Sequence, residues 1–233
     1  MEKLFVSRSE NKYLLSYVDA LSLQKKLDKL LRRDTYSENG KYAVRSLYFD
    51  SLNNKDLYEK LAGLETRKKI RIRSYDPHGT RCKLEVKHKQ GDAQSKKSIW
   101  IDRAETERLI AGDYGVLLDR GDVSGDTVWF YTQMSLGGYR PVTMIEYDRL
   151  AYVYDQFDTR ITFDMNIRST EACFDLFAEA PPYFKDLGDQ VVLEVKYNGK
   201  LVKFLSELFK PYHLTRVAVS KYQMGRKSYL DFI

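Results

Sequence analysis

The feature that most constrains this chain is a pair of segments in which charged and apolar side chains alternate. In residues 67–74 every odd position carries a cation, while Ile70 and Ile72 occupy even positions. In residues 81–89 every odd position is charged, and the even positions include Leu84. Because side chains alternate along a strand, each segment predicts a strand with a charged face and a largely apolar face.

Between these two segments, the run Asp76-Pro77-His78-Gly79 has the residue types of a tight turn. The two segments therefore predict an antiparallel hairpin. For one hairpin, a solvated outer face would explain the charged side equally well, because antiparallel sheets commonly leave one face in water.

The same alternation recurs elsewhere, and this favours a common role for the charged faces. Charged or polar side chains alternate with others at Arg8, Glu10 and Lys12, at Arg160, Thr162 and Asp164, and at Glu194 and Lys196. The last pair interrupts an otherwise apolar run, 191–197. Small polar residues would serve on an outer face, so the repeated use of long charged ones indicates a function.

Aromatic residues make up 13% of the 233 positions, and this enrichment favours strands. Strands are predicted near 5–14, 42–50, 67–75, 81–89, 97–102, 139–149, 159–164, 189–197 and 215–220. Helices are predicted near 17–33, 103–111, 124–135 and 200–209, and in the first of these Val18, Leu21, Leu27, Leu30 and Leu31 share a face. Short turns between the strands are typical of antiparallel meanders.

The fold class predicted is α+β: an eight-stranded antiparallel closed β-barrel with accessory helices, as a single domain over 1–233. The net charge is +6, and it is concentrated. Between Lys60 and Arg103 there are thirteen Lys and Arg against five Asp and Glu. Burying like charges without partners costs several kcal/mol per ion, so a barrel interior lined by them must hold water and an anion. A polyanion would meet this need.

The two cysteines, Cys82 and Cys173, have no metal-ligand spacing and form no disulfide framework, which favours a reducing compartment. The first twelve residues lack the apolar core of a signal peptide, and no apolar run approaches the ~20 residues that span a bilayer. A cytoplasmic location is therefore expected.

Eight short motifs together resemble one family. They are RSENKY (8–13), RSLYFD (45–50), RKKIRIRSY (67–75), LEVK (84–87), EYDR (146–149), RITFD (160–164), LEVKY (193–197) and SKY (220–222). In this order and spacing they resemble the VTC domain, the polyphosphate polymerase domain of the CYTH-like triphosphate tunnel metalloenzyme superfamily. The resemblance runs from about residue 5 to 225.

The resemblance implies a tunnel that binds ATP and polyphosphate and transfers the γ-phosphate of ATP to a growing inorganic polyphosphate chain. It implies catalytic phosphate contacts by Arg71, Arg73, Lys87, Arg149, Arg160 and Lys221. Lys12, Lys60, Lys196 and Glu10 are expected to bind substrate, Lys60 at a position that can be Arg in the family.

The resemblance also implies that Glu194 binds a metal ion, and Glu85, Glu146 or Glu10 could assist it. Carboxylate and phosphate oxygens are hard ligands, so Mg²⁺ or Mn²⁺ is the expected cofactor.

Two positions depart from the wider pattern. Arg8 stands where hydrolytic or cyclising relatives often begin a Glu-x-Glu-x-Lys motif, which favours the polymerase branch. Ala218 lies near a position where a basic residue is expected, with Arg216 close by.

Two alternatives stay open: a hydrolase of tripolyphosphate or nucleoside triphosphates in the same tunnel, and a polyanion-binding module without activity. No specific nucleic-acid partner is expected, because no known nucleic-acid-binding motif occurs. A membrane-protein partner outside this chain is left open. Trp100 and Trp129 are predicted to anchor the core, and His78, His88 and His213 to lie in loops or on the surface.

Overall fold

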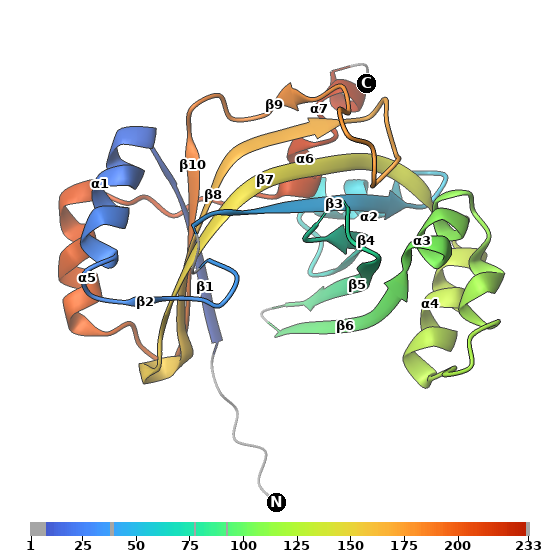
Figure 1. Cartoon of the computed structure of the whole chain (residues 1–233), viewed down its shortest axis with the longest axis horizontal. Coiled ribbons are helices and arrows are strands. Elements are labelled where there is room, and N and C mark those ends of the chain that lie inside the picture. Colours follow the sequence, from blue (N-terminus) through green and yellow to red (C-terminus); the bar gives the residue numbers. More distant parts are fainter. Residues whose placement is uncertain (1–7, 38–39, 77, 92, 232–233) are drawn as a thin grey trace, which may run out of the picture. The chain divides into compact units, whose positions relative to one another are not determined.

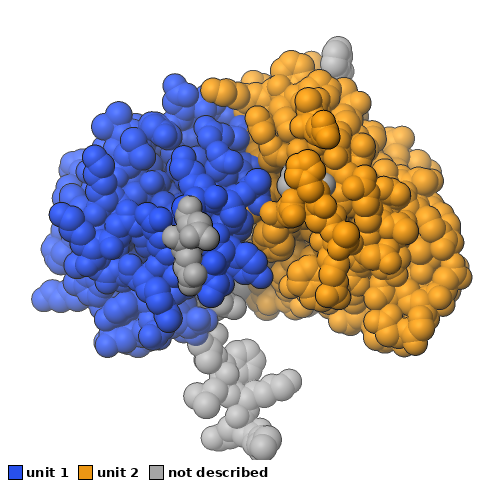
Figure 2. Space-filling model, in the orientation of Figure 1, with its two compact units in different colours: residues 1–43, 147–167, 187–220 blue, residues 44–146, 168–186, 221–233 orange. Residues whose placement is uncertain are grey.

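The structure is a computed structural model that describes residues 8–37, 40–76, 78–91 and 93–231. The chain divides into two compact units, coloured separately in Figure 2. Unit 1 comprises Met1–Ala43, Tyr147–Ile167 and Leu187–Ser220, and unit 2 comprises Val44–Glu146, Arg168–Asp186 and Lys221–Ile233. The chain passes repeatedly from one unit to the other. A single domain over 1–233 stays a prediction.

The strands belong to one antiparallel sheet with the order β1-β10-β8-β7-β3-β4-β5-β6. Their bounds are β1 Arg8–Leu15, β3 Tyr42–Asp50, β4 Thr66–Ser74, β5 Arg81–Gln90, β6 Ala93–Asp102, β7 Arg140–Tyr154, β8 Thr159–Thr170 and β10 Val191–Asn198. Two short strands, β2 Arg32–Arg33 and β9 Phe184–Lys185, pair with β7 and β8. The α+β class and the antiparallel sheet are confirmed.

Closure of the barrel is not confirmed. Within the described ranges, β1 and β6 end the strand order, and no ladder joins one to the other. A closed barrel needs that last pairing, so closure stays a prediction.

The helices are short and connect or flank the strands. They are α1 Tyr17–Leu27, α2 Lys55–Leu61, α3 Arg103–Ile110, α4 Gly125–Leu136, α5 Lys203–Phe209, α6 Lys221–Met224 and α7 Lys227–Leu230, with 3-10 turns η1 Tyr114–Leu117, η2 Gln156–Asp158 and η3 Lys210–Tyr212. Helix α2 was not predicted, since its seven residues are too few for a clear periodic pattern. The strand predicted at 215–220 is absent apart from a bridge between Tyr13 and Arg216.

Unit 1 has its apolar core on one side of β1, β10 and β8. Odd-numbered residues of these strands, such as Leu193 and Phe163, pack against α1 and α5. The two helices lie side by side (Figure 1), and Leu23 and Leu205 from them are fully buried. The even-numbered positions of the same strands point to the other side of the sheet.

The apolar face predicted for α1 is only partly correct. Leu27 is buried as predicted, but Val18 is 75% exposed, and Ala20 and Leu23 are buried in its place. The helix ends at Leu27 rather than near residue 33, so Leu30 no longer belongs to its face. Ser16 caps its start by accepting a hydrogen bond from the Asp19 backbone N–H at 3.1 Å, as an N-cap serine commonly does.

Unit 2 is built around the ladder of β4, β5 and β6. The predicted turn at 76–79 is confirmed, with the Gly79 N–H donating to the Asp76 carbonyl at 3.0 Å. Apolar side chains such as Ile72 and Leu84 form one face of the ladder. Helices α3 and α4 and the η1 turn cover this face with residues that include Leu109 and Phe130.

The prediction that Trp100 anchors this core is wrong, because its side chain is 43% exposed. Trp100 occupies an even position of β6, whereas Ile99 and Ile101 occupy the odd positions that face the core. Trp129 does pack against the core, as predicted, and half-buried His88 contacts its ring edge at a centroid distance of 5.2 Å. His78 and His213 are exposed.

The two faces of β5 predict different effects of substitution on stability. Leu84→Ala should lower the free energy of unfolding by about 2–5 kcal/mol, because it leaves a cavity in the core. Lys87→Ala, three residues away on the charged face, where Lys87 is exposed, should change it by no more than about 0.5 kcal/mol. Urea unfolding at constant m-value measures both, and equal losses would contradict the assignment of the faces.

Candidate functional site

The charged face predicted for the hairpin exists, and strand register extends it over four strands of unit 2. Lys69, Lys87 and Lys96 lie directly opposite one another on β4, β5 and β6. The charged face of unit 2 is defined here as Ser46 and Tyr48 on β3; Lys69, Arg71 and Arg73 on β4; Lys83, Glu85 and Lys87 on β5; and Lys96, Ser98 and Trp100 on β6. It carries six cations and one carboxylate.

That carboxylate, Glu85, is buried and binds several of the cations. Its Oε2 accepts from Arg71 Nε at 2.9 Å and lies 3.8 Å from Arg73 Nη1, while its Oε1 pairs with Lys96. Burial alone would raise the pKa of Glu85, but the charges of Arg71, Arg73 and Lys96 hold the pKa at about 2. Glu85 therefore stays ionised and fixes the two guanidinium groups.

Tyr48 joins these cations to the C-terminal segment of unit 2. Its hydroxyl accepts from Arg71 Nη1 at 3.0 Å, and its ring stacks on Tyr222 with centroids 5.3 Å apart. Burial would raise the pKa of Tyr48, but the charges of Arg71, Arg73 and Lys221 outweigh it and lower that pKa. Lys221, the first residue of α6, therefore lies close enough to contribute to the field at this face.

Tyr222 is itself held by a buried carboxylate. Its hydroxyl donates to Asp50, whose two oxygens also accept from the Asp56 and Leu57 backbone N–H groups at the start of α2, at 2.9 and 3.0 Å. The fully buried side chain of Asp50, at the end of β3, thus connects that strand both to the first turn of α2 and to α6. This connection positions Tyr222, and with it the neighbouring Lys221.

The remaining predicted cations of unit 2 differ in their setting. Lys87 is exposed and faces Lys69 and Lys96, so like charges are directly opposed in that row, an arrangement that destabilises a ladder. Lys60 is half-buried in the last turn of α2, off the strands. An anion placed over Lys69, Lys87 and Lys96 would relieve the repulsion among these three lysines.

Unit 1 has a second charged face, of different composition. In the ladder, Lys12 lies opposite Glu194, and Glu10 lies opposite Lys196. The charged face of unit 1 is defined here as Glu10 and Lys12 on β1, Glu194 and Lys196 on β10, Arg160, Thr162 and Asp164 on β8, and Arg149 on β7. Its cations and carboxylates nearly balance, in contrast to unit 2.

Each cation of this second face has a carboxylate partner. Lys196 Nζ lies 2.6 Å from Glu194 Oε1, and Lys12 Nζ lies 3.7 Å from Glu194 Oε2 and 3.4 Å from Glu10 Oε1. Arg149 donates two bonds to Asp164, at 2.6 and 2.8 Å, a bidentate geometry. Burial would lower the pKa of Arg149, but the Asp164 charge keeps it raised.

Arg160 projects from β8 and pairs with Asp34 in the loop after β2. The Asp34 carboxylate also accepts from the Ser37 N–H at 2.9 Å, so the partner of Arg160 is fixed by the backbone. The guanidinium of Arg160 is 38% exposed, which leaves it accessible to an anion.

Glu146, expected to assist metal binding, lies on the opposite face of β7 from Arg149. Its Oε2 accepts from Arg45 Nε at 2.6 Å, and its Oε1 from Arg168. Arg45 also donates to the carbonyls of Leu176 and Ala178, at 3.0 and 2.7 Å. Glu146 thus ties strands to a loop, and because β7 residues alternate in direction, it has no part in either charged face.

A divalent ion fits best at Glu10 and Glu194. Both carboxylates contact the ammonium groups of Lys12 and Lys196, so they lie near one another; Glu194 is buried and Glu10 is half-buried. Thr162 lies opposite Glu194, and its buried Oγ1 has no hydrogen-bond partner in the described chain. These oxygens suit Mg²⁺ or Mn²⁺. The described ranges hold no group of three or more His, Cys, Asp or Glu arranged around one point.

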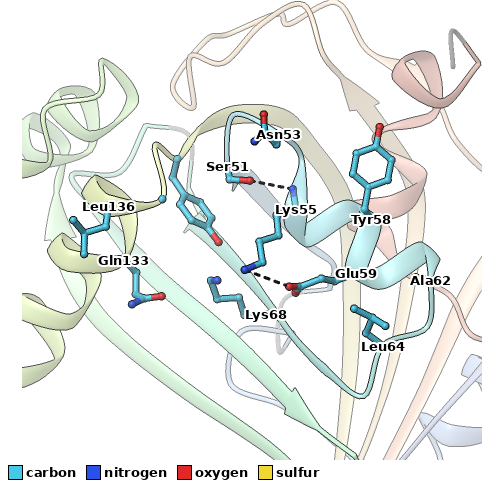
Figure 3. A pocket seen from close by; sticks show the side chains of 12 residues that line it. Ser51, Asn53, Lys55, Tyr58, Glu59, Ala62, Leu64, Lys68, Gln133 and Leu136 are labelled. Carbon is cyan, nitrogen blue, oxygen red and sulfur yellow. Dashed lines mark hydrogen bonds and ion pairs between the residues drawn. The ribbon is translucent and has the colours of Figure 1, made fainter.

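A separate cavity of unit 2 is a weaker candidate for binding phosphate. It has a volume of about 840 Å³ and lies among α2, the start of β4 and the end of α4 (Figure 3). Two cations point into it, Lys55 and Lys68, but each has a nearby carboxylate: Glu59 at 3.8 Å and Asp56 at 3.7 Å. Its charge is balanced, so the charged face of unit 2, with its excess of cations, is the better candidate.

Several residues of that face were not predicted as site residues. Lys96 was missed because the strand was predicted to begin at 97, and β6 begins at Ala93. Tyr48 lies in the RSLYFD motif, but nothing in the sequence shows that its hydroxyl meets Arg71. The period-two pattern combined with the correct register would have identified both.

The fold is an antiparallel sheet with flanking helices, and comparison with known proteins gives its family. The chain belongs to the VTC domain family, whose model matches residues 7–230. The family predicted from the motifs is therefore confirmed. No curated protein sequence matches the chain significantly.

Solved structures resemble the chain in fold at low identity. A Bacillus halodurans protein proposed to be an adenylate cyclase has a TM-score of 0.52 and 12% identity, over 92% of this chain and 95% of that one. The PH1819 protein of Pyrococcus horikoshii has a TM-score of 0.47 and 11% identity, over 94% and 99%. A mimivirus capping enzyme triphosphatase has a TM-score of 0.40 and 10% identity, over 88% of each.

The helices of the described residues are all too short or too polar to cross a membrane.

The depressed pKa of Glu85 predicts how this site responds to acid. The native pKa of about 2 lies below the ordinary value of 4.5, so the stabilisation is full above pH 4.5 and is lost as the pH falls towards 2. At about 1.4 kcal/mol per pKa unit, the linked contribution is about 3 kcal/mol. Glu85→Gln should therefore unfold more easily at pH 7, and the difference from wild type should shrink below pH 4.5.

Urea unfolding of both proteins from pH 7 to pH 2.5 measures this difference. Glu107→Gln, on the exposed surface of α3, is the control and should show a small difference that varies little with pH. A Glu85→Gln effect that is the same at pH 7 and at pH 2.5 would contradict the ion-pair account.

Proposed function

We propose that this protein is a metal-dependent polyphosphate polymerase, which transfers the γ-phosphate of ATP to the end of an inorganic polyphosphate chain. The observation that carries the proposal is the composition of the charged face of unit 2, whose facing strand positions hold six cations and one carboxylate. Such a surface needs a multiply charged anion. Membership of the VTC domain family supports the same conclusion, since the motifs of this family imply polyphosphate synthesis.

Phosphoryl transfer depends mainly on positioning and on stabilising negative charge. Arg71 and Arg73 project from alternate positions of one strand, and Glu85 and Tyr48 hold Arg71 in place. A fixed guanidinium can donate two bonds to a phosphate, each of about 1.5–3 kcal/mol as a charge-assisted bond. Lys87, an exposed residue, adds a point charge.

The reaction proposed balances without a covalent enzyme intermediate. An oxygen of the terminal phosphate of the acceptor attacks the γ-phosphorus of ATP, and the bond from that phosphorus to the β–γ bridging oxygen breaks. ADP leaves with the electron pair on its β-phosphate. The nucleophile is already an anion, so a strong general base is not needed.

Glu10 and Glu194, with the Thr162 hydroxyl, are the residues that would hold Mg²⁺ or Mn²⁺. When bound, such an ion neutralises phosphate charge and orients phosphate oxygens. Lys12 and Lys196, which contact these carboxylates, could then turn to phosphate. A cytoplasmic location, where ATP is abundant, is part of the proposal.

The arginine pair provides the first test. Arg71→Ala and Arg73→Ala should each reduce polyphosphate synthesis from ATP by at least about a hundredfold, the scale of losing a charged transition-state contact. Arg108→Ala removes the same charge from the helical side of unit 2, where Arg108 pairs with Asp113, and should leave synthesis unchanged. Gel analysis of the product measures the chain, and thermal unfolding checks that each variant is folded.

Three outcomes would overturn the polymerase assignment. Release of orthophosphate alone from ATP or tripolyphosphate would indicate the hydrolase alternative. Binding of polyphosphate without turnover would indicate a binding module. Loss of activity that only follows loss of folding would give the arginines a structural role.

The metal site predicts a separate effect. Glu194→Gln should raise the Mn²⁺ concentration needed for half-maximal activity by about tenfold or more, because it removes a charged ligand. Isothermal titration with Mn²⁺ alone should show the same loss of affinity. Glu107→Gln serves again as the control. A Glu194→Gln variant with unchanged Mn²⁺ affinity in both assays would exclude Glu194 as a ligand.

A further inference from the structure

Trp100 is an exposed tryptophan on a surface rich in cations, and the core does not account for it. It is 43% exposed, although indole is one of the most costly rings to leave in water. It lies at the end of the charged face of unit 2, on the last strand of the sheet order. Two cations lie over its ring, with Lys83 Nζ at 4.7 Å and Arg81 Cζ at 5.5 Å from its centroid.

The register places Trp100 in the same row as an arginine proposed to bind phosphate. Arg73 lies opposite Lys83, and Lys83 lies opposite Trp100. Neighbouring strands are about 4.8 Å apart, so the Arg73 and Trp100 backbones are separated by roughly 10 Å. This is the scale that separates the phosphates of an extended nucleoside triphosphate from its base. Lys83 lies between them, where a phosphate near the ribose would be.

We propose that Trp100 stacks on the base of the nucleoside triphosphate whose phosphates bind Arg71 and Arg73. The inference rests on the proposed function, since it concerns the nucleotide of that reaction. An aromatic ring stacks on the face of any base, and such contacts are sequence-tolerant. Arg81 and Lys83 restrict the ring, so little side-chain freedom is lost when a base binds.

This assignment gives recognition of the base and recognition of the phosphates to different residues. The cations bind any polyphosphate, whether it is the donor or the acceptor. Only the donor carries a base, so a stacking residue at the edge of the cationic face lets the site distinguish ATP from the chain that it extends. Trp100 is thus a specificity residue, and Arg71 and Arg73 are the shared phosphate contacts.

Fluorescence tests the proposal directly, because the chain has two tryptophans. In a Trp129→Phe background, Trp100 is the remaining one. In the absence of divalent metal, ATP should quench its emission, and tripolyphosphate, which has no base, should bind with much less quenching. Trp100→Leu should weaken ATP binding about 5- to 150-fold and leave tripolyphosphate binding unchanged. Calorimetry measures both affinities, and Trp100→Phe should restore most of the ATP affinity.

Phe184→Leu is the matched control, since Phe184 is an exposed aromatic residue of the same unit, 70% exposed on β9. It should change neither affinity. Equal weakening of ATP and tripolyphosphate by Trp100→Leu, or no weakening of either, would overturn the stacking role. If tripolyphosphate binding still depends on Arg71 in that case, the proposed function stands and only this inference fails. If wild type binds neither ligand, both fail.

Discussion

The charged face of unit 2 depends on one buried carboxylate, Glu85. Concentrating cations on neighbouring strands is unfavourable, because like charges directly opposite one another destabilise a ladder. Glu85 offsets part of this repulsion by pairing with Arg71, Arg73 and Lys96, yet one carboxylate cannot neutralise six cations. The remaining charge is tolerated because the other face of the same strands is a packed apolar core. The core supplies the stability, and the residual charge is left for a ligand.

The two charged faces differ in a way that suggests different tasks. In unit 1, Arg149 is paired with Asp164, and Lys196 with Glu194, so the charges balance without a ligand. Balanced pairs of carboxylates and lysines suit a cation that exchanges with lysine. In unit 2 the excess is positive and suits phosphate. The proposed polymerase reaction needs both functions, because phosphate must be bound and its charge neutralised before another phosphate can approach.

Strand pattern was predicted well from the sequence, because the period-two alternation in 67–74 and 81–89 follows directly from backbone geometry. The failures came where information beyond local pattern was needed. Trp100 was assigned to the core because aromatic rings usually are buried, and only the register of β6 shows that it faces the other way. Glu146 was grouped with Glu194 by chemistry alone. Glu146 is at an even position of β7 and Arg149 is at an odd one, so the two side chains lie on opposite faces of that strand. Closure of the sheet depends on a pairing between β1 and β6, the first and fifth long strands in sequence, which no local signal reports.

Several residues of the family motifs are not proposed to contact phosphate, and their structural contacts explain why they belong to the motifs. In RSLYFD, Arg45 binds Glu146, Tyr48 accepts from Arg71, and Asp50 caps α2. In SKY, Tyr222 donates to Asp50 and stacks on Tyr48. The hydroxyl and ring of Tyr222 therefore connect the C-terminal segment to β3, whose Tyr48 hydroxyl bonds Arg71. The Tyr48 contact restricts Arg71, which would otherwise move away from its neighbours, and a face of mutually repelling groups needs such restriction more than an apolar site does.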